Sequence, residues 1–302
     1  MKRIAVVDIG TQSMNFLLAG FEEGRIIPLD YTVASIRLGE KLVAQSIIQS
    51  AAVEKAVESL NQFQTRATEQ NADALICIGT HVFRAAINSA EVLRAIKQST
   101  GIDIEVLSQQ EEARWSYLGA TSGFESNGSV CVIDIGGGST EITLGERSTI
   151  LHSVSIPIGA VSITERFCSS RAEIETLLAF IESTIRSAWT FALPDRCDLT
   201  GVAGTVTTLA AMSRKMTQYD PLLIEDSVLT RAGVSKWLHR LIHNSPDQRK
   251  TIPGLPQHRV DIIIGGTAIL LTILEISGKS SIRASDRGLR FGIVLREMHL
   301  FS

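Results

Sequence analysis

Short apolar runs alternate with longer amphipathic segments along the chain. Runs rich in Ile and Val predict strands at 4–7, 75–79 and 104–107, with a hairpin partner for the first at 16–20. Apolar positions at helical spacing predict helices at 47–67, 90–98 and 110–118. Strands and helices mixed in this order are typical of an α/β architecture.

The chain contains an internal repeat. The segment VVDIGTQS (6–13) recurs as VIDIGGGS (132–139), at a constant offset of 126 residues, so that Asp8 aligns with Asp134 and Ser13 with Ser139. Each copy predicts a strand, an Asp-Ile-Gly turn, a hydroxyl residue and a second strand. A duplication on this scale indicates two similar halves with equivalent loops facing a shared cleft.

A polar, glycine-containing segment at 123–128 separates the two copies and predicts the joint between domains. We therefore expect a first domain at 1–124 and a second at 125–290. A chain of 302 residues with 44% hydrophobic and 20% charged residues is long enough for two such globular domains.

The charge balance limits the partners. A formal net charge of -3 argues against a protein that coats nucleic acid, which needs a strongly basic surface. A local basic groove for a polyanion remains open, as does a solvated basic face, because one stretch holds six basic residues and a single acid, Asp247. The six are Arg231, Lys236, Arg240, Arg249, Lys250 and Arg259.

Cysteines and hydropathy bear on the compartment. The four cysteines have no paired spacing for zinc or redox chemistry, and Cys77 and Cys131 lie in apolar runs that predict burial. The apolar run after the basic start stops at Asp8, too soon for a signal peptide, and no later run is long enough to span a bilayer. We expect a soluble cytoplasmic protein with no membrane partner.

The second copy of the repeat predicts an anion site. Three consecutive glycines remove every Cβ from the turn, so that main-chain N–H groups can converge on a phosphate, and Ser139 adds a hydroxyl donor. The glycines are Gly136, Gly137 and Gly138. A tight hairpin without a ligand is the alternative interpretation, and the matching first loop favours the phosphate site.

Acids flank this turn. Asp134 ends an apolar strand, where its carboxylate can hold a divalent cation directly or through water. Glu141 begins the next strand and can share the metal. In the alternative interpretation, Asp134 only caps the turn.

A third glycine cluster lies at 201–208, before a helical run at 209–212. Gly204 and Thr205 at a helix start can present N–H groups to another phosphate, although an ordinary helix cap fits the same pattern. The segment 265–267 has the same form and the same ambiguity.

Two further charged groups are candidates for chemistry. Glu111 and Glu112 begin a predicted helix, where acids commonly complement the helix dipole, but a glutamate there can also accept a proton from water. Arg84 follows a strand and can stabilise a transferring phosphoryl group, or serve as a surface ion-pair partner. We interpret His81 as a polar loop residue, because no second histidine stands at metal spacing.

These residues are similar to one family in particular. The chain resembles the exopolyphosphatase/guanosine pentaphosphate phosphohydrolase family, within the sugar kinase–Hsp70–actin superfamily, nearly from end to end. Seven landmarks occur in the family's order: DIGTQSMN (8–15), GTHVFR (79–84), SQQEEAR (108–114), DIGGGSTE (134–141), PIGAVSITER (157–166), GVAGTVTT (201–208) and SDRGLR (285–290).

The resemblance implies a two-domain actin-like (ribonuclease H-like) phosphatase with its active site in the interdomain cleft, and a final helix at 291–302 that rejoins the first domain. It implies that Glu112 is the base toward water and that Arg84 contacts the phosphoryl group. The remaining matches are Asp134 and Glu141 for Mg²⁺, with Asp8 as a further metal candidate, Ser139 for phosphate, and Asp8, Thr11, Ser13 and Asn15 in the first phosphate loop.

Three positions depart from the family pattern. Gln109 and Ala203 replace glycines, and Phe291 replaces a glutamate. None removes a proposed catalytic group, but each bears on substrate entry or loop shape. The sequence also stops where longer members continue into a helical domain, which leaves the preferred chain length open.

We expect an Mg²⁺-dependent enzyme that hydrolyses the terminal phosphate of inorganic polyphosphate or guanosine pentaphosphate, with a place in the stringent response. Two alternatives stay open: a small-molecule kinase of the actin fold, and a non-catalytic sensor of guanosine tetraphosphate or polyphosphate. No nucleic-acid partner is expected, and a homodimer is possible.

Overall fold

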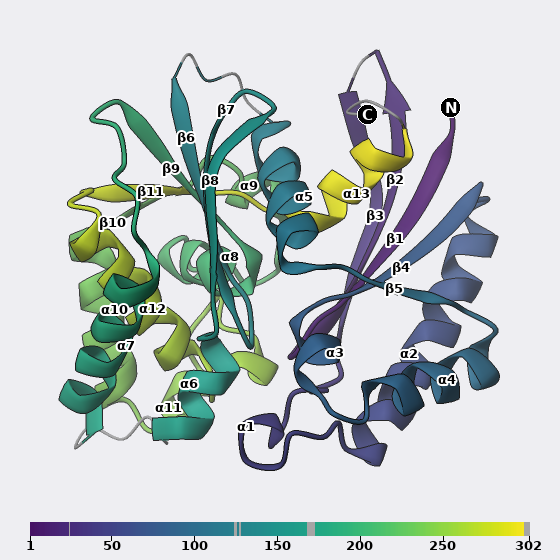
Figure 1. Ribbon diagram of the computed structural model, residues 1–302, viewed down its shortest axis with the longest axis horizontal. Helices are drawn as coiled ribbons and strands as arrows, with labels where there is room; N and C mark the ends of the chain where they lie inside the picture. Colours follow the sequence, from purple (N-terminus) through teal and green to yellow (C-terminus); the bar gives the residue numbers. More distant parts are fainter. Residues whose placement is uncertain (24, 124–125, 127, 168–172, 299–302) are drawn as a thin grey trace. The chain divides into compact units, whose positions relative to one another are not determined.

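The structure, a computed structural model, describes residues 1–23, 25–123, 126, 128–167 and 173–298. It divides into two compact units (Figure 1). Unit 1 consists of Met1–Gly119 and Leu289–Ser302, and unit 2 of Ala120–Gly288. The boundary falls just before the predicted joint at 123–128, of which residues 124, 125 and 127 lie outside the described residues.

Unit 1 is built on a five-stranded sheet in the order β3-β2-β1-β4-β5. The strands are β1 (Arg3–Ile9), β2 (Ser13–Glu22), β3 (Arg25–Ser35), β4 (Ala74–Gly79) and β5 (Ile104–Val106). The helices are α1 (Leu42–Gln45), α2 (Ser50–Glu69), α3 (His81–Ala85), α4 (Ser89–Thr100), α5 (Gln109–Thr121, which crosses into unit 2) and α13 (Leu289–Glu297).

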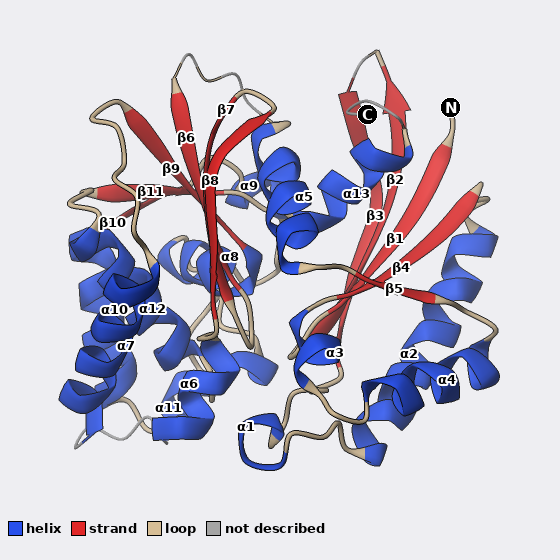
Figure 2. Cartoon of the chain, viewed as in Figure 1, coloured by secondary structure: helices blue, strands red, loops and turns tan. Residues whose placement is uncertain are grey.

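Unit 2 is built on a six-stranded sheet in the order β10-β11-β9-β6-β7-β8 (Figure 2). The strands are β6 (Ser129–Ile135), β7 (Thr140–Glu146), β8 (Thr149–Ile156), β9 (Cys197–Val202), β10 (Val228–Thr230) and β11 (Ser281–Ala284). The helices are α6 (Ala160–Phe167), α7 (Ile174–Ala188), α8 (Ala203–Ser213), α9 (Pro221–Ile224), α10 (Arg231–His243), α11 (Pro246–Lys250), η2 (Gln257–Arg259) and α12 (Ile263–Ile276).

The core of unit 1 follows from the spacing of its apolar residues. α2 buries Ala56, Leu60 and Phe63, which share one helical face at intervals of four and three residues. The Phe63 ring packs on Phe16 of β2 at 5.4 Å between centroids. Burial of a side chain of this size contributes about 2 kcal/mol, so this face fixes α2 on the sheet. The helix begins at Ser50, three residues later than predicted.

The core of unit 2 centres on α12, whose residues from Ile263 to Leu274 are all buried. Gly265 and Gly266, considered above as a phosphate-binding start of a helix, lie inside this buried helix. A Cβ on Gly266 would lie 2.4 Å from Oγ1 of Thr205, so the glycine lets α12 approach α8. Both glycines lie in the first turn of α12, and the structure gives them a role in helix packing.

The predicted repeat is confirmed strand by strand. Asp8 pairs with Asn15 across β1 and β2, as Asp134 pairs with Glu141 across β6 and β7. The first strand of each hairpin also pairs in parallel with the strand after the crossover, β4 or β9. The pairing of the second with the third strand also shifts register at equivalent places, between residues 18 and 19 in β2 and between residues 144 and 145 in β7. The two units therefore share the order and relative direction of five strands, and β10 is an additional edge strand of unit 2.

The basic stretch does not form one solvated face. Arg249 is buried and its Nη1 donates to the carbonyl of Val260 at 2.7 Å. Lys250 pairs instead with Asp247 at 2.8 Å. Arg231, Lys236 and Arg240 on α10 are exposed, so the six residues are divided between the surface and buried positions.

Cys77, Cys131 and Cys197 are buried and free, and burial raises the pKa of the Cys77 thiol to about 12. The fourth cysteine, Cys168, lies outside the described residues. Within the described ranges, every helix is too short or too polar to cross a membrane.

Candidate active site

The two repeated turns have the same backbone geometry. In unit 2 the Gly136 amide donates to the Ser139 carbonyl at 3.0 Å, and in unit 1 the Gly10 amide donates to the Ser13 carbonyl at 3.0 Å. Each hydrogen bond closes the hairpin loop over two intervening residues, which are Gly137 and Gly138 in unit 2. Glycine lacks a Cβ, so the main-chain N–H groups of this loop are accessible to an anion.

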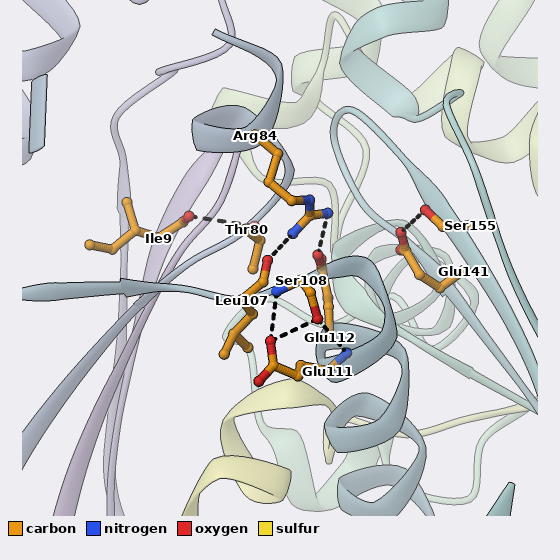
Figure 3. A network of polar contacts seen from close by, with 9 residues as sticks. All are labelled: Ile9, Thr80, Arg84, Leu107, Ser108, Glu111, Glu112, Glu141 and Ser155. Carbon is orange, nitrogen blue, oxygen red and sulfur yellow. Dashed lines mark hydrogen bonds and ion pairs between the residues drawn. The ribbon is translucent and has the colours of Figure 1, made fainter. Parts of the chain in front are cut away.

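Two acids lie opposite each other below the unit 2 turn. Asp134 and Glu141 are direct cross-strand partners, and both are buried, with exposed fractions of 9% and 2%. Ser155 of β8 donates its hydroxyl to Oε1 of Glu141 at 2.7 Å (Figure 3). Side chains at paired positions share one face of the sheet. The predicted metal-binding acids of unit 2 are thus neighbours.

The equivalent pair in unit 1 has only one acid. Nδ2 of Asn15 donates to Oδ2 of Asp8 at 3.3 Å, and Oγ of Ser13 donates to Oδ1 of Asn15 at 3.4 Å. Thr11 and Ser13 are buried in the turn, at 5% and 6% exposed. Asp8, Ser13 and Asn15 of the predicted first phosphate loop are therefore linked by hydrogen bonds.

Asp134 and Glu141 supply two carboxylates that could hold a divalent cation. Among the described residues there is no group of three or more His, Cys, Asp or Glu side chains arranged around a metal. Mg²⁺ is usually held by one or two carboxylates together with substrate phosphates and water. The paired carboxylates of Asp134 and Glu141 match that pattern.

Arg84 and Glu112 form a buried ion pair in unit 1. Nη2 of Arg84 lies 2.6 Å from Oε2 of Glu112, and the two side chains are 19% and 10% exposed. Nη1 of Arg84 donates to the carbonyl of Leu107 at 2.7 Å (Figure 3). The guanidinium is thus held on two sides, and the interpretation of Arg84 as a surface ion-pair partner is wrong.

The neighbouring acid has a structural role. Oγ of Ser108 accepts from the Glu111 amide, while the Glu111 carboxylate accepts from the Ser108 amide at 2.9 Å, which makes a capping box at the start of α5. The Ser108 hydroxyl also donates to this carboxylate at 2.7 Å, and this bond, together with the weaker effect of the Ser108 amide, lowers the pKa of Glu111. The next residue, Glu112, is left facing inward to Arg84, whereas Glu111 is exposed.

A close helix contact holds α5 in place. A Cβ on Gly292 of α13 would lie 1.9 Å from the carbonyl oxygen of Trp115. The glycine therefore lets α13 touch the backbone of the helix that carries Glu112. Phe291, a departure from the family pattern, is buried beside it at 4% exposed, while Gln109 is exposed at the start of α5.

His81 was predicted to be a polar loop residue, and this is wrong. It is the first residue of α3, three positions before Arg84, and it is partly buried. Burial, with the Arg84 charge as a smaller cause, lowers the pKa of His81 to about 4. The imidazole is therefore neutral near pH 7.

The third glycine cluster leads into α8. Gly204 and Thr205 occupy its first turn, and the Thr205 side chain packs against Gly266. The Arg259 guanidinium lies on Gly204, where a Cβ would be 1.9 Å from Nη2, and burial lowers the pKa of Arg259. Ala203 has a φ of 64°, in the region that favours glycine. Of this cluster, only main-chain groups of the first turn are candidates for phosphate.

Sequence reasoning missed three contributors. The Leu107 carbonyl that holds Arg84 leaves no signal, because any residue supplies a carbonyl. Ser155 pairs directly with Glu141 in the β7–β8 register, so strand alternation was a usable signal. Gly159 was part of a quoted landmark but was given no role.

Comparison with known proteins places these features in a family. The sequence profile of the Ppx/GppA phosphatase family matches residues 19–301. A crystal structure of the Aquifex aeolicus member of the Ppx/GppA protein family superimposes with a TM-score of 0.83, at 28% identity, over 99% of this chain and 98% of that one. The predicted duplicated actin-like ATPase fold is thereby confirmed.

Curated relatives agree. The chain is 29% identical to exopolyphosphatase 2 of Mycobacterium tuberculosis, over 98% of both proteins. It is 31% identical to the bifunctional 3-dehydroquinate synthase/phosphatase of Fusobacterium nucleatum, over 96% of this chain but 46% of that longer protein. The family profile covers well over half of the sequence, and this chain is therefore a member of the Ppx/GppA phosphatase family, a hydrolase-type enzyme.

Proposed function

We propose that this protein hydrolyses the terminal phosphate of inorganic polyphosphate, with guanosine pentaphosphate as the second candidate substrate, in a reaction that requires Mg²⁺. The observation that carries the proposal is the 2.6 Å contact between Arg84 and Glu112. A carboxylate that can accept a proton and a guanidinium that can neutralise a phosphoryl group are held together in one buried place. The relative named exopolyphosphatase 2 supports polyphosphate as the substrate.

In the proposed reaction, the oxygen of a water molecule forms a bond to the terminal phosphorus while the bridging P–O bond breaks. The water's proton passes to Glu112, and the shortened chain leaves with the bridging oxygen as an anion. General-base assistance of this kind is worth about 10²–10⁴ in rate. Since phosphoryl transfer needs little covalent help from the protein, positioning and charge supply most of the acceleration.

In this proposal, Arg84 stabilises the negative charge that spreads over the phosphoryl oxygens. Its Nη1 bond to the Leu107 carbonyl keeps the guanidinium in a fixed plane, so no side-chain ordering is needed when the phosphate arrives. Guanidinium groups in this position are worth about 10³–10⁵ in rate in other phosphoryl-transfer enzymes.

The N–H groups of Gly137 and Gly138 and the hydroxyl of Ser139 bind phosphate oxygens in this proposal. Asp134 and Glu141 would hold Mg²⁺, with Asp8 as the candidate in the other turn. The cation supplies neutralisation of phosphate charge when it is bound. Ser155 orients the Glu141 carboxylate through its hydrogen bond, as outer partners commonly do at metal sites.

The test is phosphate release from long-chain polyphosphate, short-chain polyphosphate and guanosine pentaphosphate, each with Mg²⁺ and with EDTA. Metal-dependent release supports the proposal, and the order of kcat/KM names the preferred substrate. Asp134→Asn is expected to raise the Mg²⁺ concentration needed for half-maximal rate. Ser153→Ala on β8, two strands away in the same sheet, is the control.

Two other outcomes would replace the proposal. Tight binding of polyphosphate or guanosine tetraphosphate by folded protein, without phosphate release, would make the chain a sensor. ATP-dependent phosphorylation of a small acceptor, with no release from the three substrates, would make it a kinase of the same fold.

A further inference from the structure

The first turn of α6 is hydrogen-bonded to the glycine turn of unit 2. The Ala160 amide donates to the Gly136 carbonyl at 2.9 Å, and the amides of Val161 and Ser162 donate to the Gly137 carbonyl at 2.8 and 3.1 Å. The carbonyls of two consecutive glycines therefore accept hydrogen bonds from a single helix terminus. These hydrogen bonds satisfy N–H groups at the start of α6 that have no acceptor inside the helix.

These bonds fix the direction of the glycine N–H groups. In a trans peptide the C=O and N–H point in opposite directions, and the described residues contain no cis peptide bond. The Gly136 carbonyl points at α6, so the Gly137 N–H, in the same peptide, points away from α6. The Gly137 carbonyl orients the Gly138 N–H in the same way. Two successive N–H groups on one side form a concave site for an anion.

Gly159 is the residue that permits this contact. A Cβ on Gly159 would lie 2.4 Å from the Gly137 carbonyl carbon and 2.6 Å from the Gly138 nitrogen. Its φ is not positive, so space rather than backbone conformation requires glycine. Ser162 fixes Gly159 in turn, because its Oγ accepts from the Gly159 amide at 2.8 Å and donates to the Gly159 carbonyl at 3.2 Å.

Unit 1 contains a similar arrangement. The Gly39 amide donates to the Thr11 carbonyl at 2.9 Å, and the Arg37 amide donates to the Gln12 carbonyl at 3.0 Å. A Cβ on Gly39 would lie 2.0 Å from Cγ2 of Thr11. Both turns are therefore supported by the segment that follows the third strand, with a glycine at the closest approach. The arrangement thus occurs at both copies of the repeated turn.

We propose that Gly159 is a positioning residue for phosphate binding. By letting α6 sit against the turn, it holds the Gly137 and Gly138 N–H groups in the orientation that receives phosphoryl oxygens. The inference rests on the proposed function only for the nature of the ligand, a phosphate group, and not on turnover.

The experiment measures inorganic phosphate binding to the full chain by calorimetry, and the response of the Gly137 and Gly138 amide signals by ¹H–¹⁵N NMR. Gly159→Ala is expected to weaken phosphate affinity about 10-fold or more, as two misaligned hydrogen bonds to a charged group would. Ser162→Ala is the second variant, for use where Gly159→Ala does not fold, because it adds no atom that could clash. It is expected to weaken phosphate affinity about 2–5-fold.

Gly128→Ala is the matched control. It adds the same methyl group in unit 2, at 3.3 Å from the Arg196 carbonyl oxygen and before the opposite end of β6. Phosphate affinity and both amide responses should survive in this variant, whatever its melting temperature.

The inference is overturned if folded Gly159→Ala and Ser162→Ala bind phosphate as the wild type does. It is also overturned if phosphate leaves the two wild-type amide signals unmoved. A wild-type protein that binds phosphate at these amides but releases none from polyphosphate refutes only the proposed hydrolysis, so the two failures are distinguishable.

Discussion

Arg84 and Glu112 face each other from helices that follow neighbouring strands of one sheet. Arg84 lies on α3, directly after β4, and Glu112 lies on α5, after β5. Nη2 of Arg84 lies 2.6 Å from Oε2 of Glu112. The groups proposed as base and as charge stabiliser are thus positioned by the same hydrogen-bonded pair of strands, and substitution of each side chain tests its role.

Glu112→Gln should reduce kcat about 10²–10⁴-fold while leaving phosphate affinity close to that of the wild type. The amide keeps the shape of the side chain but cannot take up the proton of water. The check is steady-state kinetics together with calorimetric phosphate binding. Glu111→Gln is the control, since glutamine also completes a capping box. Near-normal turnover of Glu112→Gln would remove Glu112 from the role of base.

Arg84→Met should lower the free energy of unfolding by about 3 kcal/mol, because it leaves the buried Glu112 carboxylate without its counter-charge. The double variant Arg84→Met with Glu112→Gln should recover part of that loss, since the remaining amide is neutral. Urea unfolding of the wild type, both single variants and the double variant measures the coupling. Strictly additive losses would show that the ion pair contributes nothing beyond its two side chains.

His81 should make the protein less stable in mild acid. Its pKa is about 4 in the fold, mainly through burial, against about 6.5 in the unfolded chain. The unfolded state therefore binds more protons between these values, so stability falls as the pH drops from about 6.5 to about 4. The loss is of the order of 2 kcal/mol, and His81→Gln should remove it. NMR titration that shows a charged His81 at pH 6 would contradict this.

Ala203→Gly should leave the free energy of unfolding unchanged or raise it by up to about 1 kcal/mol. Ala203 has a φ of 64°, and relief of that strain offsets the larger backbone entropy of glycine. Ala210→Gly, in the buried middle of the same helix, should instead cost about 1 kcal/mol or more. Urea unfolding compares the two, and a similar loss in both would mean that Ala203 is not strained.

Much of the site was predictable because it depends on strand periodicity and on the repeat. A fixed offset between two Asp-Ile-Gly turns places Asp134 opposite Glu141 as soon as a hairpin is assumed. The burial of Arg84 was not predictable, because it depends on a hydrogen bond to the Leu107 carbonyl, more than twenty residues away in the chain. Ala203 could be recognised in the sequence as a departure from the family's glycine. Its positive φ could not, because it arises from the turn between β9 and α8.

The same limit applies to two other segments. Gly265 and Gly266 match the pattern of a phosphate-binding turn as well as they match a helix contact, and the contact with Thr205 is visible only in the structure. His81 lacks a local signal for its helix, because α3 is five residues long and too short for a hydrophobic period.

The division of the chain into units has a consequence for biosynthesis. Unit 2 is continuous in sequence, whereas unit 1 takes α13 from residues that follow all of unit 2. α13 packs on β1, β2 and β3 and buries Ile293, Val294 and four neighbours. At about 5–20 residues per second, a ribosome needs roughly ten to thirty seconds to make unit 2. During that interval the emerged part of unit 1 lacks its last helix, so unit 1 cannot complete its core until the residues after unit 2 have been made.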